Sequence, residues 1–218
     1  MNTRYKILLC ATKLFLEKGY TNTYVTNITN MLKISTGNLT FHFPTKEHIL
    51  AELIGELNAF QKQTESGMEQ TGYGLPIAYL QELAMFASVC EENPNIRDLV
   101  IAAYTHTLSL EIIRENDTIR TKHTFGEFCT NWTDEHFIQA ENVVSGIEYA
   151  MYRLENTQDI SFEQRVTSGI DAIMKIYEVP EHIRQRIVAE VMSSDYRDRG
   201  SHVFEEFCRH VANSFSGD

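Results

Sequence analysis

The sequence predicts an all-α protein. Apolar residues recur at helical spacing through nearly all of the 218 residues, and no alternating run or strand hairpin interrupts them. Only 4 prolines and 11 glycines are present, which favours long uninterrupted elements. No stretch approaches the roughly 18 consecutive apolar residues that a membrane span needs. We therefore expect a small amino-terminal group of helices followed by a helical bundle.

The first third of the chain predicts two long helices with two short ones between them. The first long helix covers 3–18 and stops at Gly19, a residue suited to a helix end. Thr23 is the expected cap of the next, short helix, which runs to about residue 31. A turn at 32–35 and a second short helix at 36–42 follow. Pro44 stops that helix, and a longer one is expected at 46–65, ended by the glycine-containing stretch 66–76.

The remaining helices are predicted from their apolar faces. Three segments look apolar on all sides and are expected to be buried, at 77–90, 96–115 and 118–131. Two amphipathic helices are expected at 134–155 and 161–177, the second opened by a capping box of Ser161 and Gln164. Two further helices are expected in the tail, at 181–193 and 201–214.

Charge is unevenly spread along the chain. The net charge is -11, yet residues 1–50 hold six Lys or Arg and two acidic residues, a balance of +4, which leaves -15 for the rest. A basic head on an acidic body is the asymmetry that an electrostatic footprint on nucleic acid shows.

The four cysteines lie far apart and form no C-x-x-C pair, so neither a disulfide framework nor a clustered zinc site is indicated. The amino terminus lacks the apolar core of a signal peptide. We expect a cytoplasmic protein with no cofactor and no metal.

Three helices in the first fifty residues, the last two short and joined by a tight turn, describe a helix-turn-helix. In that motif the last helix enters the major groove of DNA. The candidate reading helix spans 35–42, where Asn38 can reach base edges and Gly37 allows close approach to the duplex. A solvated helix in an ordinary bundle is the alternative interpretation of these residues.

The motif resembles the amino-terminal signature of the TetR family of transcriptional regulators. The resemblance is carried by Gly19-Tyr20, Thr23, Ile28 and the run from Ile34 to Glu47, and it covers about residues 5–54. It implies an all-helical homodimer with a DNA-binding domain at 1–45 and a ligand-binding and dimerisation domain at 46–218. Such a protein is a ligand-responsive regulator, most often a repressor, that binds double-stranded DNA at a palindromic operator and responds to a small-molecule effector.

The chain departs from the family pattern at three positions of this motif, the first being Thr29, which replaces a usual small Ala. Thr40 stands where the family usually has Tyr, which removes a ring often used on DNA. Lys33 stands where the family commonly has Gly, so a left-handed conformation there would cost about 1 kcal/mol. Leu39 and Phe43 are assigned to packing. Carried over from the resemblance, the DNA-binding residues are Tyr24, Thr26, Thr36, Gly37, Asn38, Thr40, His42 and Lys46, of which Tyr24 and Lys46 would meet phosphates.

The composition of the middle of the chain suggests a mostly apolar pocket with a few polar groups, as ligand sites have. The acidic residues Glu82 and Glu111 would favour a cationic ligand there. Ordinary core packing is the alternative for every residue of this set. The candidate ligand-binding residues are Met85, Phe86, Tyr104, His106, Thr107, His123, Phe125, Phe128 and Trp132, with Cys129 among them.

The two amphipathic helices are the expected dimer interface. Ser145-Gly146 and Ser168-Gly169 permit close approach of helices, and with their symmetry mates the two helices would form a four-helix interface. Effector binding is expected to shift the helix at 46–65 and so change the spacing of the two reading helices. The candidate interface residues are Val143, Ile147, Met151, Val166, Gly169, Ile170 and Ile173.

An enzyme, or a helical binding protein without DNA, is the competing class. His123 and Glu127 lie four apart with His136 nearby, a spacing that permits a metal or acid-base site. No catalytic motif accompanies them, and Gly72-Tyr73-Gly74 is a lone glycine pair that reads as a loop. We therefore expect no catalysis.

Overall fold

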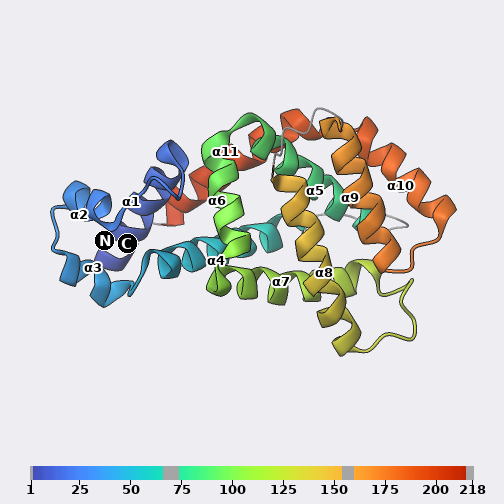
Figure 1. Ribbon diagram of the computed structural model, residues 1–218, viewed down its shortest axis with the longest axis horizontal. Helices are drawn as coiled ribbons and strands as arrows, with labels where there is room; N and C mark the ends of the chain where they lie inside the picture. Colours follow the sequence, from blue (N-terminus) through green and yellow to red (C-terminus); the bar gives the residue numbers. More distant parts are fainter. Residues whose placement is uncertain (1, 66–73, 154–159, 215–218) are drawn as a thin grey trace. The chain divides into compact units, whose positions relative to one another are not determined.

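The computed structural model of the protein describes residues 2–65, 74–153 and 160–214, and these ranges hold eleven α-helices and no strand (Figure 1). The all-α prediction is confirmed. Among the described helices, none combines the length and the apolar character that crossing a bilayer demands. The helices are α1 Thr3–Lys18, α2 Val25–Leu32, α3 Thr36–His42, α4 Lys46–Glu65, α5 Gly74–Glu92, α6 Pro94–Thr105, α7 Thr107–Phe125, α8 Asp134–Tyr152, α9 Phe162–Ile176, α10 Glu181–Ser193 and α11 Tyr196–Ser214.

Contacts divide the chain into two compact units. The first comprises residues 1–67, 93–113 and 203–218, and the second comprises 68–92 and 114–202. Helix α7 begins in the first unit and continues through the second. The predicted division at residue 45 separates functions rather than contact units, and it stays a prediction.

The core of the first unit forms around α1, whose apolar stripe includes the fully buried Ile7, Leu8 and Phe15. Leu39 of α3 and Leu50 of α4 belong to the same cluster, so the short reading helix is fixed against a continuous core. Helices α1, α2 and α3 lie together in Figure 1, in blue. The packing of α1 therefore positions the helix-turn-helix.

Gly19 ends α1 as predicted. Its φ of 81° is the left-handed conformation that glycine adopts without steric cost, and its N–H donates to the carbonyl of Phe15. A Cβ at this position would lie 2.6 Å from Oδ2 of Asp98 in α6, so both conformation and space require glycine here.

The second unit is built on α8 and α9, which lie side by side (Figure 1). The stripe of α9 formed by Val166, Ile170 and Ile173 is fully buried. A Cβ on Gly169 would collide with the side chain of Met151 in α8, so this glycine permits the close approach of the two helices. The predicted capping box at the start of α9 is confirmed, since Ser161 and Gln164 exchange hydrogen bonds of 2.8 and 3.2 Å.

Several predicted boundaries are wrong. The chain breaks at His106 rather than near residue 116, because the Thr105 hydroxyl donates to the Ile101 carbonyl at 2.9 Å and the Ser109 hydroxyl to that of Ala103 at 2.8 Å. These side-chain bonds compete with the helical ladder without any Gly or Pro. Helix α7 is also exposed along one side, at Glu111, Glu115, Ile119 and Lys122, so the expectation of a helix apolar on all sides fails there.

Smaller differences concern caps and ends. Tyr24, not Thr23, is the N-cap of α2: its N–H donates to the Asn27 side chain at 2.7 Å, while the buried Thr23 hydroxyl donates to the Gly19 carbonyl at 2.8 Å. Helix α11 begins at Tyr196, five residues before the predicted start. Helix α5 begins at Gly74, three residues before its predicted start, so Gly74 and the rest of the expected loop up to residue 76 are helical. Helix α8 ends at Tyr152, before the predicted end at 155. Residues 66–73, which hold the remainder of the expected loop, and 154–159 lie outside the described residues.

Candidate functional site

The turn between α2 and α3 is held by its own hydrogen bonds. Lys33 ends α2 in the left-handed conformation, with φ 54° and ψ 42°. The N–H of Ile34 donates to the Thr29 carbonyl at 3.1 Å. Ser35 then caps α3 by accepting the N–H of Asn38 at 3.1 Å. The sequence thus specifies the bend even without glycine, at a cost of about 1 kcal/mol for a side chain in this conformation.

Helix α3 has one face in the core and one in solvent. Leu39 and Phe43 are fully buried, which confirms their assignment to packing. Phe41 is two residues from each of them, so at 3.6 residues per turn it lies about 200° around the helix axis from either. Its ring is 84% exposed, more than any other large apolar side chain described. The outermost part of α3 is therefore an apolar ring.

Most of the residues predicted to contact DNA are open to solvent. Tyr24, Thr26, Thr36, Gly37, Asn38 and Thr40 are exposed, while His42 and Lys46 are half-buried. By helical spacing Gly37 and Asn38 flank the outward direction of Phe41, whereas Thr36 and Thr40 lie closer to the core side. Sequence reasoning missed Phe41, although its spacing from Leu39 and Phe43 was a readable signal.

Lys46, the first residue of α4, is engaged inside the first unit. Its ammonium donates to the carbonyls of Tyr20 at 2.7 Å and Thr23 at 2.9 Å, and it lies 3.9 Å from the centre of the Tyr20 ring. Burial lowers the pKa of Lys46, while the negative charge of Asp98 acts in the opposite direction. The ammonium thus joins the start of α4 to the loop after α1. Its predicted phosphate contact stays a prediction.

Two further charged groups brace the same head. The carboxylate of Asp98, on α6, accepts the backbone N–H of Thr21 at 2.7 Å and its hydroxyl at 2.6 Å. Arg4 of α1 pairs with Glu52 of α4 and donates to the carbonyl of His42 at 2.6 Å. The loop after α1 and the end of α3 are each fixed by a charged side chain from another helix.

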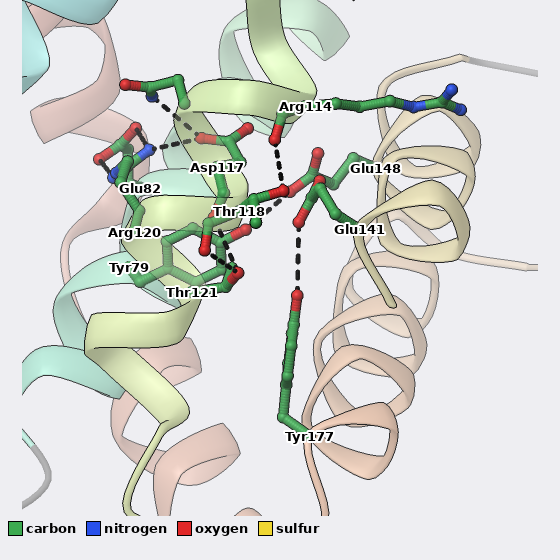
Figure 2. A network of polar contacts seen from close by, with 11 residues as sticks. Tyr79, Glu82, Arg114, Asp117, Thr118, Arg120, Thr121, Glu141, Glu148 and Tyr177 are labelled. Atoms are coloured by element: carbon green, nitrogen blue, oxygen red, sulfur yellow. Dashed lines mark hydrogen bonds and ion pairs between the residues drawn. The ribbon is translucent and has the colours of Figure 1, made fainter. Parts of the chain in front are cut away.

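A second polar site lies on α7 and α8 in the second unit (Figure 2). Asp117, Glu141 and Glu148 are buried, and one carboxylate oxygen from each lies within 4.8 Å of the others. The Tyr79 hydroxyl donates to Glu148 at 3.0 Å, and the Tyr177 hydroxyl donates to Glu141 at 3.3 Å. Three carboxyl groups are thus gathered away from water.

Basic and amide groups at this site balance only part of the charge. Arg120 donates to Glu82 at 2.7 Å and to Asp117 at 3.3 Å, and Asn116 donates to Asp117 at 3.2 Å. Two buried oxygens, Oε1 of Glu141 and Oδ1 of Asn116, have no hydrogen-bond partner. A buried polar atom without a partner costs free energy.

The surroundings favour the neutral forms of these acids. Burial, and then the charges of Glu148 and Asp117, raise the pKa of Glu141 to about 10. Burial also raises the pKa of Asp117 to about 6, although the charge of Arg120 acts to lower it. At neutral pH, with no further positive charge at the site, Glu141 holds a proton.

The comparison with known proteins identifies the family. Residues 7–53 match the family model described as bacterial regulatory proteins, tetR family. The HTH-type transcriptional regulator QacR of Staphylococcus aureus is 29% identical over 162 residues, 67% of this chain and 85% of that protein. The HTH-type transcriptional regulator HbdR of Aromatoleum is 33% identical over 138 residues, 63% of this chain and 56% of that protein. Residues 7–53 thus place the amino-terminal part of the chain in the TetR family.

Solved structures share the fold of this TetR-family protein. GusR of Salmonella enterica has a TM-score of 0.51 and 21% identity, covering 81% of this chain and 96% of its own. TylP, a TetR regulator from Streptomyces fradiae, has a TM-score of 0.52 and 18% identity, and the match covers 94% of this chain and 97% of its own. The family model and the two relatives support the prediction of a DNA-binding transcriptional regulator, and the solved structures confirm its fold.

The residues predicted to bind ligand fall into both units of the TetR-family chain. Tyr104, His106 and Thr107 belong to the first unit; Met85, Phe86, His123, Phe125, Phe128 and Trp132 belong to the second. Met85 and Phe125 are buried, and the Phe125 ring stacks on Tyr177 with centroids 4.7 Å apart. Thr107 and His123 are exposed. The ligand assignment stays a prediction.

The predicted dimer residues are mostly covered by the chain itself. Met151, Val166, Gly169, Ile170 and Ile173 are buried between α8, α9 and their neighbours. Val143 is 56% exposed and Ile147 is half-buried. The same apolar stripe that suggested an interface is thus used for packing within the chain. The predicted interface, which no observation here tests, rests on Val143 and the outward side of α8.

The residues considered for an enzyme are not assembled. Helix α7 ends at Phe125, so Glu127 does not share a helix face with His123, and both side chains are exposed. The nitrogen Nδ1 of His136 accepts the N–H of Thr133 at 3.0 Å, at the start of α8. The acidic site of α7 and α8 was not predicted from the sequence.

Proposed function

We propose that the protein is a homodimeric repressor that binds a palindromic operator and leaves it when a small-molecule effector binds. The outward face of α3 carries this proposal, because it offers Gly37, Asn38 and Phe41 to a groove while Leu39 and Phe43 anchor the helix. Residues 1–45 form the DNA-binding domain, and 46–218 serve effector binding and dimerisation. The protein acts in the cytoplasm, without catalysis.

Asn38 and Phe41 read the bases in two different ways. The amide of Asn38 can pair bidentately with adenine, a contact worth about 1 to 3 kcal/mol of discrimination. The Phe41 ring has no polar atom, and the apolar feature of the major groove is the 5-methyl group of thymine. We expect Phe41 to favour thymine at one position of each half-site.

Dimerisation places two reading helices on one operator. Half-sites one turn of DNA apart require recognition helices about 34 to 36 Å apart, so a small change in the body uncouples one of them. The outward side of α8 around Val143, with α9, is the proposed interface. The effector is expected among the predicted ligand-binding residues.

The experiment is operator selection by the purified protein from random duplexes, followed by fluorescence anisotropy over a salt series. Asn38→Ala should flatten base preference at one position and leave the slope of log affinity against log salt nearly unchanged. Phe41→Ala removes the exposed ring of α3. Ile119→Ala is its matched control, because it removes an exposed apolar side chain from a different helix, α7.

Replacing thymine by uracil at each operator position removes only the methyl group. One such replacement should weaken wild-type binding several-fold and leave binding by Phe41→Ala unchanged. Equal weakening of wild type and variant would contradict the assignment of Phe41. Absence of any selected palindrome would contradict the operator proposal as a whole.

A further inference from the structure

The acidic site formed by Asp117, Glu141 and Glu148 asks for a positive charge that the surrounding side chains only partly supply. Glu141 and Glu148 are fully buried and Asp117 is 8% exposed. Arg120 lies against Asp117 but shares its guanidinium with Glu82, and the charge of Arg114 acts on Glu141 without offsetting the effect of burial on its pKa. Isolated buried carboxylates are strongly unfavourable, so proteins keep them protonated, paired or bound to a metal. The fold therefore maintains this cluster against its intrinsic cost.

A proton alone leaves the site incomplete. Oε1 of Glu141 has no hydrogen-bond partner, although the side chain is fully buried and its other oxygen accepts the Tyr177 hydroxyl. Figure 2 shows the Glu141 carboxyl group beside that of Glu148, with the Tyr177 bond on the other side. An acceptor that is buried and unused by the chain is available to a group from outside it, such as a water molecule or an ion.

The geometry points to a small ion. One oxygen from each of the three carboxylates lies within 4.8 Å of the other two. An ion at about 2.3 to 2.6 Å from oxygen, the range of Ca²⁺, spans roughly that separation when bound between them. Carboxylate and hydroxyl oxygens are the ligands of hard cations, whereas zinc and copper sites use His and Cys. No histidine belongs to the cluster.

We propose that Asp117, Glu141 and Glu148 bind one hard divalent cation, of the class of Ca²⁺, Mn²⁺ and Mg²⁺. The sequence predicted no metal, because Glu141 and Glu148 follow Asp117 by 24 and 31 residues and form no spaced motif with it. The cation neutralises the like charges and uses the free oxygen of Glu141. Tyr79 and Tyr177 orient two of the carboxylates through their hydroxyls. The site belongs to the second unit and stands whether or not the proposed operator binding is correct.

The test is a titration of full-length protein that has been stripped with EDTA and returned to chelator-free buffer. MnCl₂, CaCl₂ and MgCl₂ are added separately, with calorimetry and thermal melting as readouts and the electron-spin resonance of free Mn²⁺ as a count of bound ions. We expect saturable binding of one ion per chain and a melting temperature that rises with ion concentration.

Two variants assign the binding to the cluster. Glu141→Gln and Glu148→Gln keep the size of the side chain and one acceptor but remove the charge, and each should weaken ion binding at least tenfold. Glu135→Gln, an exposed acid on the same helix α8, is the matched control and should bind as wild type does. Far-UV circular dichroism establishes that each variant is folded, and ion binding by wild type stands as the independent measurement.

Three outcomes overturn the proposal. Wild type that binds none of the three ions at millimolar concentration has no such site. Binding that survives in both Gln variants lies elsewhere on the chain. Stabilisation by an organic ammonium probe such as tetramethylammonium, lost in Glu141→Gln and not reproduced by the metals, assigns the cluster to an organic cation instead.

Discussion

The group around Lys46 in the first unit and the acidic site in the second unit are both polar and at least partly buried, but they differ in how well their charges are matched. The single ammonium of Lys46 meets two carbonyls and an aromatic face, with the charge of Asp98 acting in its favour. The acidic site gathers three carboxyl groups within 4.8 Å, and one oxygen remains unused.

This difference suggests a structural role for the Lys46 group and a binding role for the acidic site. A charge whose partners all come from the same chain fixes local geometry, as Lys46 fixes the loop before α2. Buried acids gathered at one place destabilise the chain that contains them, and protonation of Glu141 offsets only part of that cost. We infer that the first site holds the DNA-binding head in shape and that the second is poised to respond.

The largest effect is expected from a buried charge that cannot be neutralised. Ile170→Arg places a guanidinium at a fully buried position of α9, and unlike a carboxyl group it cannot shed its charge by a change of protonation. We expect a loss of about 3 to 5 kcal/mol of unfolding free energy, measured by urea denaturation. Val143→Arg carries the same charge at a 56% exposed position and should leave stability nearly unchanged while testing the dimer by light scattering. If the Ile170→Arg variant is stable but monomeric, Ile170 lies in the dimer interface, which would then include α9.

Lys46→Met should cost about 2 to 3 kcal/mol, because it leaves two carbonyls without their charged donor. Lys13→Met is the control, since Lys13 is exposed and pairs only at 3.8 Å with Glu17. Thermal and urea denaturation measure the loss. An effect equal to that of Lys13→Met would show that the Lys46 ammonium faces solvent. It would then contradict the structural role assigned to the Lys46 group. A salt slope reduced by about one unit in the folded variant would support its phosphate contact as well.

A smaller effect is expected at Asp98. Asp98→Ala removes two hydrogen bonds to Thr21, which lie at the surface, and should lower stability by about 1 kcal/mol. A double-mutant cycle with Thr21→Val isolates the hydroxyl bond from the backbone bond. Strict additivity of the two substitutions would mean that the hydroxyl bond contributes nothing.

The smallest effect has the opposite sign. Lys33→Gly should raise stability by about 0.5 kcal/mol, because glycine adopts the left-handed conformation freely but loses more chain entropy on folding. Chemical denaturation with matched m-values measures the gain. A destabilised variant would mean that the turn depends on the Lys33 side chain rather than only tolerating its conformation.

The head could be predicted because its signals are local. Gly19, the turn at Lys33 and the cap at Ser35 each act within a few residues, so α1, α2 and α3 follow from the sequence nearly residue by residue. The break at His106 could not be predicted in the same way, because Thr and Ser side chains end the helix without Gly or Pro. Ile170 is a different case: an apolar stripe reveals that a face is covered and not which chain covers it, so its role at an interface stays a prediction.

The acidic site was only partly visible in the sequence. Glu141 and Glu148 lie seven residues apart, on the same stripe of α8 as the buried Phe137, Val144 and Met151. Charged residues on an otherwise apolar stripe are a signal of buried acids. Asp117 joins them only through tertiary packing, so the cluster itself could not be derived from spacing.

The exposed ring of Phe41 has a thermal consequence. In the free protein its apolar surface is hydrated, and contact with a base would release that water. Loss of hydrated apolar surface makes the heat capacity of association negative, so the enthalpy of operator binding should change with temperature. Calorimetry at several temperatures would then show a shallower dependence for Phe41→Ala, and operator affinity would pass through its maximum at a temperature that this one side chain helps to set.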